Sequence, residues 1–256
     1  MSKLFVIMGK SFSGKDYLKN AILNEKEFCE ENNIVELVRY TNRPMRDGEV
    51  DGREYNFINT EDVRKYMHSK SVISSYDTEY GKWHYITDLS KMKKDTNYIT
   101  IADINDIIKY KEILPLEDIC IIYLIPPNWK IFQRFSERKD YGDDRYKEIY
   151  RRFVDDTYKF YYKSNDVLTG VNSIVNVGVD FKLHDILHAM IDIINSDRKD
   201  LIILNKNKYH LFENNSNGIE FLKYNKVSFY KIEIFDGDIV IHTETEDIDI
   251  DYDFII

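Results

Sequence analysis

Gly9-Lys10-Ser11-Phe12-Ser13-Gly14-Lys15-Asp16 is the stretch that decides the fold of this chain. Its spacing fits the pattern G-x-x-x-x-G-K, in which backbone N–H groups surround phosphate oxygens and the lysine reaches the outer phosphates of a nucleotide. An apolar run over 4–8 precedes it and a helical pattern begins at Lys15, so strand, loop and helix N-terminus follow one another as anion binding requires. A simple Gly/Ser turn is the alternative. We predict a phosphate site formed by Gly9, Ser11, Ser13, Gly14 and Lys15.

Asp16 departs from the usual form of this loop, because Ser or Thr commonly follows the lysine and binds Mg²⁺ through its hydroxyl. Carboxylate oxygen is also a ligand that Mg²⁺ accepts in proteins. We therefore expect Asp16 to hold Mg²⁺, either directly or through a water molecule.

The composition is that of an ordinary folded protein, with 43% apolar and 32% charged residues in a chain of 256. This length suits one large core with a small appendage, or two modest domains. No apolar run approaches the roughly 20 residues that span a bilayer, and the short N-terminal run does not have the form of a signal peptide. With Cys29 and Cys120 as the only cysteines, no disulfide framework is expected. The sequence predicts a cytoplasmic protein without a membrane partner.

The net charge of −9 is concentrated near the C-terminal end of the chain. Residues 232–256 contain nine acidic residues and no Lys or Arg, whereas the other 36 acidic residues balance the 36 Lys and Arg residues. A nucleic-acid-binding surface needs a basic excess, and the sequence shows no large one. We therefore expect no nucleic-acid partner.

Strand-like runs alternate with helical patterns up to about residue 197, which predicts an α/β domain with a mainly parallel sheet. The strongest strand is the unbroken apolar run at 119–125, a pattern typical of a strand that is buried on both faces. Over 198–256 the helical pattern stops, and alternating runs predict a small antiparallel β extension whose role stays open. The remaining expected elements are strands at 34–38, 72–73, 83–86, 98–103, 173–177, 201–204, 209–212, 219–224, 227–235, 239–242 and 248–256, and helices at 15–32, 60–69, 106–113, 128–139, 144–164 and 180–195.

A second motif occupies residues 39–57, which read RYTNRPMRDGEVDGREYNF. Arg43 and Arg46 stand three residues apart beside a proline, and Gly-Glu and Tyr55 follow. Because guanidinium groups suit phosphate oxygens, this arrangement can gather several donors around one phosphate. A solvated, charged loop is the alternative. The segment closely resembles the acceptor-binding signature of guanylate kinases, T-x-R-x-x-R-x-G-E-x-x-G-x-x-Y-x-F.

The resemblance covers roughly residues 3–196. It implies a three-layer P-loop kinase fold over 1–197, with an acceptor-binding region at about 39–90 and a lid at about 134–152. The further matching features are Tyr80-Gly81, Asp103-Ile104-Asn105, Pro126-Pro127, the lid residues Arg134, Arg138 and Arg152, and Asn176 on the strand near the family's adenine site.

By resemblance, the chain transfers the γ-phosphoryl group of ATP to a nucleoside monophosphate, GMP or dGMP, with Mg²⁺ as cofactor. Such a reaction is catalysed mainly by positioning and by spreading positive charge over the migrating group. Lys15 and the three lid arginines would supply that charge, Asp16 and Asn176 would add to the ATP site, and Asp16 and Asp103 would hold the metal or its water shell. The acceptor-binding residues implied are Arg39, Thr41, Arg43, Arg46, Tyr55, Ser74, Tyr80, Asp103 and Asn105.

Three positions depart from the family where it recognises the guanine edge. Arg39 replaces a Ser or Thr, Ser74 or Ser75 replaces a Glu, and Asn105 replaces a carboxylate of Asp-Ile-Asp. Guanine N–H groups need an acceptor, whereas Arg offers only donors. The choice of base therefore stays open at the level of sequence.

Two other functions are compatible with these residues. Ribose 1,5-bisphosphokinases have the same general fold and are similar in carrying Gly-Lys-Asp and Arg-Tyr-x-x-Arg, but they lack the longer continuation that this chain keeps. A catalytically silent guanylate-kinase-like module that binds a protein partner is the other alternative, although such modules usually lose the glycines and lysine retained here. The sequence is consistent with either a monomer or a homodimer.

Overall fold

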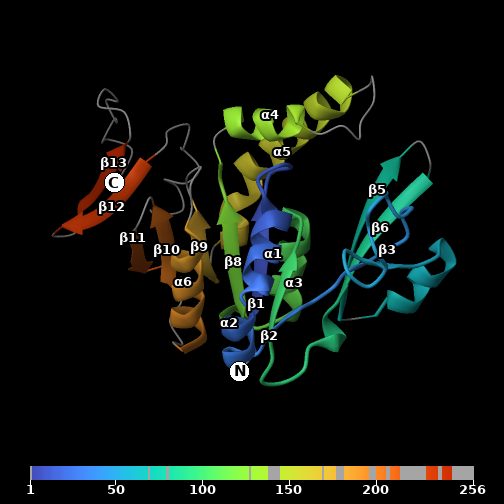
Figure 1. Ribbon diagram of the computed structural model, residues 1–256, viewed down its shortest axis with the longest axis horizontal. Coiled ribbons are helices and arrows are strands. Elements are labelled where there is room, and N and C mark those ends of the chain that lie inside the picture. The colour runs from blue at the N-terminus through green and yellow to red at the C-terminus, as the bar shows by residue number, and fades with distance from the viewer. Residues whose placement is uncertain are drawn as a thin grey trace.

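The structure is a computed structural model, shown in Figure 1, that describes most of the chain as far as residue 195 and four β-strands beyond it. The residues described are 2–68, 70–78, 81–126, 128–137, 145–168, 170–176, 182–195, 200–205, 208–213, 229–235 and 238–243.

The main sheet has seven strands in the order β11-β10-β9-β8-β1-β7-β2. All neighbouring pairs are parallel except β10 and β11, which pair antiparallel. A mainly parallel sheet with helices on both faces is the predicted α/β fold, and the prediction is confirmed. The strands are β1 (Leu4–Gly9), β2 (Ile34–Glu36), β7 (Asn97–Ile101), β8 (Ile119–Leu124), β9 (Asn172–Asn176), β10 (Asp200–Asn205) and β11 (Lys208–Glu213).

Strand β1 lies at the centre of a three-layer arrangement, and all six of its residues are buried. Successive side chains of a strand point to opposite faces, so Leu4, Val6 and Met8 pack on one side while Phe5 and Ile7 pack on the other. The first face is covered by α3 (Ile104–Ile113) and α5 (Arg145–Leu168), and the second by α1 (Lys15–Asn24) and α6 (Leu183–Asn195).

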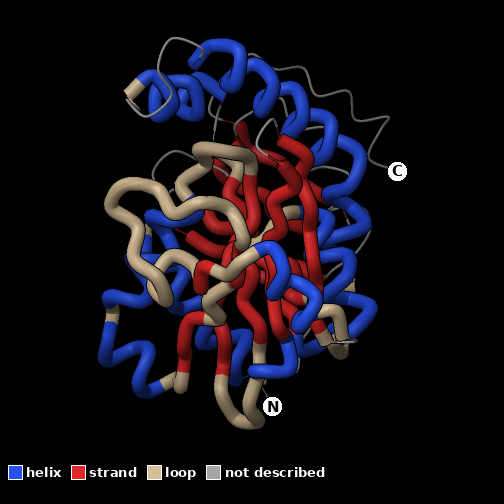
Figure 2. Tube along the Cα trace, turned by 90° about the vertical axis from the view of Figure 1, so that its right-hand side faces the viewer, coloured by secondary structure: helices blue, strands red, loops and turns tan. Residues whose placement is uncertain are grey.

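The predicted helix at 15–32 is two helices, α1 and α2 (Lys26–Glu31). Glu25 separates them because its backbone, at φ −77° and ψ 74°, leaves the helical region. Helices α4 (Asn128–Ser136) and α5 follow β8, as expected, and Figure 2 shows them lying across one end of the strands.

A separate four-stranded sheet, in the order β4-β3-β6-β5, forms the predicted acceptor-binding region. Its longest strands, β5 (Ser71–Thr78) and β6 (Gly81–Asp88), extend beyond the strands expected at 72–73 and 83–86. The short strands β3 (Tyr40–Thr41) and β4 (Asn56–Phe57) bracket the arginine-rich segment. A core of Tyr40, Val63 and Ile86 holds this sheet together.

Short 3₁₀ helices complete the described chain: η1 (Thr60–Tyr66), η2 (Leu89–Lys91) and η3 (Leu116–Asp118). The first lies where a helix at 60–69 was expected.

The C-terminal stretch begins by extending the main sheet, because β10 pairs in parallel with β9. The boundary at residue 197 is therefore no boundary of the sheet, although the division into two domains stays a prediction. Strands β12 (Phe229–Phe235) and β13 (Asp238–Thr243) pair antiparallel on either side of residues 236–237. The runs expected at 219–224 and 248–256 lie outside the described residues. Within the described chain, no helix has the length and apolar character needed to cross a bilayer.

Candidate active site

The predicted phosphate loop connects the carboxyl end of β1 to the N-terminus of α1. A Cβ on Gly9 would lie 2.6 Å from Ser13 Oγ and 2.7 Å from the Leu124 backbone oxygen, so only glycine fits there. Gly14 caps α1 with φ +101°, a left-handed conformation that glycine adopts without steric cost. The loop is thus fixed by backbone geometry at both of its glycines.

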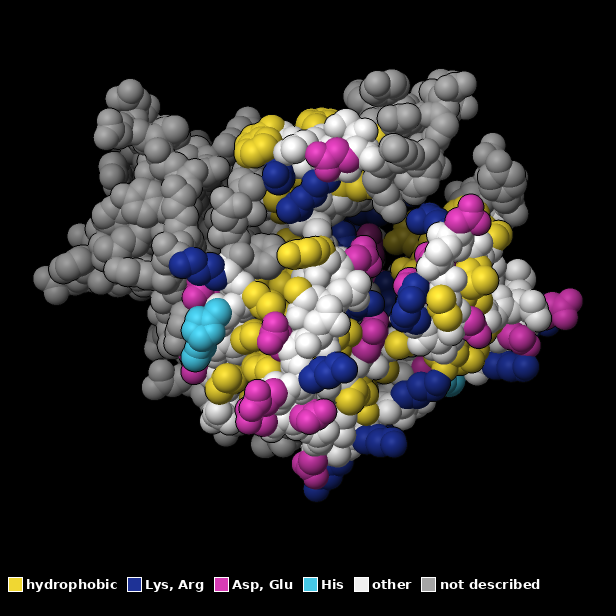
Figure 3. All heavy atoms as spheres, in the orientation of Figure 1, with side chains coloured by type: hydrophobic (Ala, Val, Ile, Leu, Met, Phe, Trp, Pro, Cys, Tyr) yellow, Lys and Arg dark blue, Asp and Glu magenta, His cyan; other side chains and the backbone are white. Residues whose placement is uncertain are grey.

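Lys15 turns back over this loop, and its Nζ donates hydrogen bonds of 2.8 Å to the backbone oxygens of Gly9 and Lys10. Burial lowers the pKa of Lys15, while the negative charges of Asp16, Asp156 and Asp103 act in the opposite direction. Figure 3 shows a hollow beside the main body where Lys, Arg, Asp and Glu side chains gather.

Arg134 on α4 binds the backbone of the phosphate loop. Its Nη1 donates to the backbone oxygen of Ser13 at 2.6 Å and to that of Phe12 at 3.3 Å. A Cβ added at Gly14 would lie 3.1 Å from the same nitrogen. The structure thus brings this predicted lid arginine to the loop, whereas Arg138 and Tyr80 lie outside the described residues.

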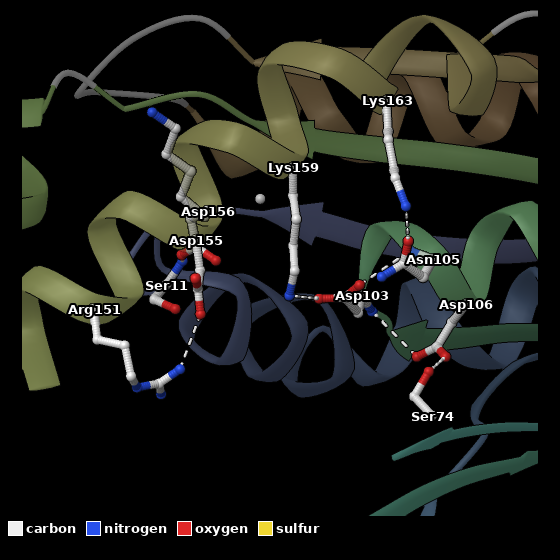
Figure 4. A network of polar contacts seen from close by, with 12 residues as sticks. Ser11, Ser74, Asp103, Asn105, Asp106, Arg151, Asp155, Asp156, Lys159 and Lys163 are labelled. Carbon is white, nitrogen blue, oxygen red and sulfur yellow. Dashed lines mark hydrogen bonds and ion pairs between the residues drawn. The ribbon is translucent and has the colours of Figure 1, made fainter. Parts of the chain in front are cut away.

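Helix α5 contacts the loop and the N-terminus of α3 through one face (Figure 4). Asp156 Oδ2 accepts a 2.5 Å hydrogen bond from the backbone N–H of Ser11. Lys159 Nζ lies 3.6 Å from Asp103 Oδ2, and Lys163 Nζ donates to Asn105 Oδ1 at 2.7 Å. Residues 156, 159 and 163 share a helix face because their spacings are three and four. The Asp156 carboxylate thus accepts the hydrogen bond of the Ser11 N–H, a loop group that we expect to donate to phosphate when a nucleotide binds.

Arg152 and Asn176 complete the predicted donor side. Arg152 lies one helical turn before Asp156, and its positive charge contributes to lowering the pKa of Lys15, so it belongs to the same charged group. Asn176 ends β9, where its Cα pairs with that of Leu124 in β8.

Arg43 follows β3 in the predicted acceptor-binding region. Its Nη1 and Nη2 donate to the two carboxylate oxygens of Glu49 at 2.8 and 2.5 Å, and its guanidinium carbon lies 5.0 Å from the Tyr55 ring centroid. The backbone N–H of the exposed Arg46 donates to Glu49 as well. Bidentate pairing fixes the plane of the guanidinium, so Glu49 holds Arg43 in one orientation. Thr41 is fully buried, and its hydroxyl donates to the backbone oxygen of His84.

Tyr55 lies beside Arg43 and Tyr85 in the predicted acceptor-binding region. Burial raises its pKa, the positive charges of Arg39 and Arg43 act to lower it, and the Asp16 carboxylate acts to raise it. The Asp16 carboxylate is close enough to Lys15 and to Tyr55 to influence the pKa of each. The phosphate loop and the predicted acceptor-binding segment therefore lie near a common carboxylate.

Sequence reasoning missed Asp106 and Asp156. Asp106 receives hydrogen bonds from two predicted residues, Arg39 Nη2 at 2.7 Å and Ser74 Oγ. The signal for Asp106 was its place in the run Asp103-Ile104-Asn105-Asp106, which starts a helix with a capping box. The signal for Asp156 was its spacing of four from Arg152, which places both side chains on one helix face.

With this geometry in place, comparison with known proteins identifies the family. The family profile described as guanylate kinase matches residues 1–186. The chain belongs to the guanylate kinase family.

Several relatives named guanylate kinase align with it at low identity. The protein of Chlorobium luteolum is 26% identical over 152 residues, which cover 57% of this chain and 73% of that protein. Those of Clostridium acetobutylicum and Clostridium tetani are 28% and 27% identical, covering 67% and 79% of this chain and 84% and 93% of their own lengths. A crystal structure of guanylate kinase from Anaplasma phagocytophilum has a TM-score of 0.49 at 16% identity, covering 75% of this chain and 84% of that one.

Membership of the guanylate kinase family confirms the predicted enzyme class. The protein is a nucleoside monophosphate kinase, a P-loop transferase that binds nucleotides. The roles of individual site residues in this family member stay predictions.

Replacing Glu49 with Gln should flatten the acid dependence of stability. Hydrogen bonds from Arg43 lower the pKa of Glu49 from its ordinary value of 4.5. A depressed folded-state pKa stabilises the protein above the unfolded-state pKa, and this contribution is lost as the pH falls through the folded-state value. Urea unfolding from about pH 6 down to about pH 3 should show a smaller decline for Glu49→Gln than for the wild type. The exposed Glu61→Gln variant is the control, and parallel curves for wild type and Glu49→Gln would contradict the assignment.

Replacing Asp156 with Asn should strengthen ATP binding. The Asp156 carboxylate accepts the Ser11 N–H and places negative charge beside the loop, so ATP phosphates must displace it. Losing one such hydrogen bond corresponds to about a two- to tenfold lower Kd for ATP, measured by calorimetry. Asp155→Asn is the matched control, because Asp155 pairs with Arg151 on the exposed side of the helix. Weaker ATP binding in Asp156→Asn would show instead that this carboxylate supports the bound state.

Proposed function

We propose that this enzyme transfers the γ-phosphoryl group of ATP to GMP or dGMP, with Mg²⁺ as its cofactor. The observation that carries the proposal is a set of polar contacts that runs from the phosphate loop to the four-stranded sheet. Helix α5 contacts Ser11 through Asp156 and Asp103 through Lys159, and Asp106 in the same helix α3 pairs with Arg39. Two neighbouring groups of donors suit a reaction in which phosphoryl passes between two bound anions. The names of the aligned relatives support guanine as the base.

The donor phosphates are assigned to the loop N–H groups, Lys15 and the arginines of α4 and α5. Lys15 then leaves the backbone oxygens of Gly9 and Lys10 and points to phosphate. The acceptor phosphate is assigned to Arg43, Arg46 and Tyr55. Because Glu49 already orients Arg43, little reorganisation of that guanidinium is needed when the phosphate arrives.

The donor set near the loop fits Mg²⁺. This ion is usually held by one or two carboxylates together with substrate phosphates and water, not by an all-protein cage. Asp16 is exposed beside Lys15, and within the described chain no group of three or more acidic, His or Cys side chains is placed to bind a metal. Asp16 would hold the ion, which would neutralise charge on the ATP phosphates. Asp103, whose carboxylate caps α3 and faces Lys159, would order water around it.

A phosphorylated sugar such as ribose 1,5-bisphosphate is the second candidate acceptor. It is favoured by one observation, the buried ion pair between Arg39 and Asp106 at a position that reads the base in the family. A sugar phosphate has no base edge to be read, so this acceptor would leave the pair undisturbed.

An acceptor panel tests the proposal directly. ADP release from ATP should depend on GMP or dGMP and should exceed that with CMP, UMP or ribose 1,5-bisphosphate. Lys15→Met should reduce kcat by about 100-fold or more, because a preorganised positive charge is lost from the transition state. Lys26→Met, at an exposed position in α2, is the control that should leave the rate unchanged. Absence of turnover with every nucleoside monophosphate would overturn the proposal.

A further inference from the structure

Arg39 and Ser74, two of the predicted base-reading residues, are joined to each other through Asp106. Arg39 Nη2 donates to Asp106 Oδ2 at 2.7 Å, and Ser74 Oγ donates to Asp106 Oδ1. The Asp106 side chain is completely buried and that of Arg39 is 10% exposed. Figure 4 shows Asp106 between Ser74 of β5 and Asp103 at the start of α3. The cluster of Arg39, Ser74 and Asp106 is a fixed wall, because a buried charged pair cannot separate without exposing an unpaired charge.

Hydrogen-bond acceptors on this wall are already engaged by the protein. Asp106 Oδ2 also accepts the backbone N–H of Asp103 at 3.3 Å, so each carboxylate oxygen has a donor. Asn105 Oδ1 accepts from Lys163 at 2.7 Å. The N1–H and 2-amino groups of guanine are donors and need acceptors. The wall is therefore poorly suited to the 2-amino group of guanine, which hypoxanthine lacks.

One hydrogen-bond donor of Arg39, in contrast, is unused within the described residues. Arg39 Nη1 donates to the backbone oxygen of Ile101 at 3.3 Å, and Nη2 is held by Asp106. Among the described residues, the buried Nε–H of Arg39 has no hydrogen-bond partner. Buried N–H groups are nearly always paired, so an unpaired one indicates a missing acceptor. An oxygen or ring nitrogen of a ligand would supply it.

The position of Arg39 suits the base of a nucleotide whose phosphate lies at Arg43. The Arg39 guanidinium carbon is 5.8 Å from the Tyr85 ring centroid, and the Tyr85 and Tyr55 centroids are 5.7 Å apart. Tyr55 in turn contacts Arg43. A second aromatic side chain, Tyr76, lies edge-on to Tyr85 with centroids 5.6 Å apart. These rings offer apolar surface for a flat base between the phosphate group and the donor wall.

We propose that the Nε–H of Arg39 recognises the 6-oxo group of a purine and that the pocket does not read the 2-amino group. O6 is a hydrogen-bond acceptor of guanine, and hypoxanthine presents the same oxygen. Adenine presents a 6-amino donor in place of O6, so it meets the Arg39 donor unfavourably. The enzyme consequently accepts GMP and IMP about equally and rejects AMP. This inference rests on the proposed function, because it concerns the acceptor of that reaction.

The test compares kcat/KM for GMP, IMP and AMP in a coupled ADP-release assay. For the wild type, GMP and IMP should differ by less than about threefold, and both should exceed AMP by about 10- to 100-fold. A larger preference for GMP over IMP would overturn the inference while leaving the kinase function intact. Turnover of no nucleoside monophosphate would instead overturn the proposed function, and the inference with it.

A paired substitution tests the residue assignment. Arg39→Gln with Asp106→Asn replaces the ion pair by two amides, so no unpaired buried charge remains. The double variant should lose GMP and IMP turnover together by about 10- to 100-fold, with AMP unchanged, so discrimination narrows. Arg53→Gln, an exposed change in the same segment, should leave all three ratios as they are. A double variant that folds and keeps the wild-type ratios of kcat/KM among GMP, IMP and AMP would show that Arg39 does not choose the base. If the double variant does not fold, the ratios measured for the wild type decide the case.

Discussion

The structure depends on carboxylates inside the protein that pair with hydrogen-bond donors shielded from water. Three donors of the predicted site are met by an internal carboxylate: Arg43 by Glu49, Arg39 by Asp106, and the Ser11 N–H by Asp156. Burying such donors without partners would be strongly destabilising, because an isolated charge loses its hydration. The carboxylates therefore allow the donor groups to exist in the folded protein before any nucleotide arrives.

These carboxylates are expected to respond differently when a substrate binds. Glu49 orients Arg43 and can stay when a phosphate binds, whereas Asp156 lies on a loop N–H group that phosphate would take. Asp156, Lys159 and Lys163 share one face of α5, so the same helix contacts the phosphate loop and, at the N-terminus of α3, Asp103 and Asn105. Asp106 lies in the first turn of α3.

The sequence was sufficient for the parts of the fold that local pattern specifies. The buried runs of β1 and β8 and the loop between Gly9 and Lys15 follow from hydrophobicity and glycine spacing. Partners that lie far along the chain did not follow: Asp106 is 67 residues from Arg39, and Asp156 is 145 residues from Ser11. Likewise, the run that became β10 gave no sign that it would join β9 in parallel, since short apolar runs carry no information on strand direction.

We propose that the loop around Lys15 and the cluster around Arg43 bind two anions in one hollow, close enough together for phosphoryl transfer. A compound in which guanosine and adenosine are joined through five phosphates would fill both sites at once. Titration calorimetry should show one molecule bound per chain, at least about 100-fold more tightly than ATP or GMP alone, because joining the two ligands makes the second binding step intramolecular. Binding no tighter than that of ATP, or two molecules per chain, would contradict the claim.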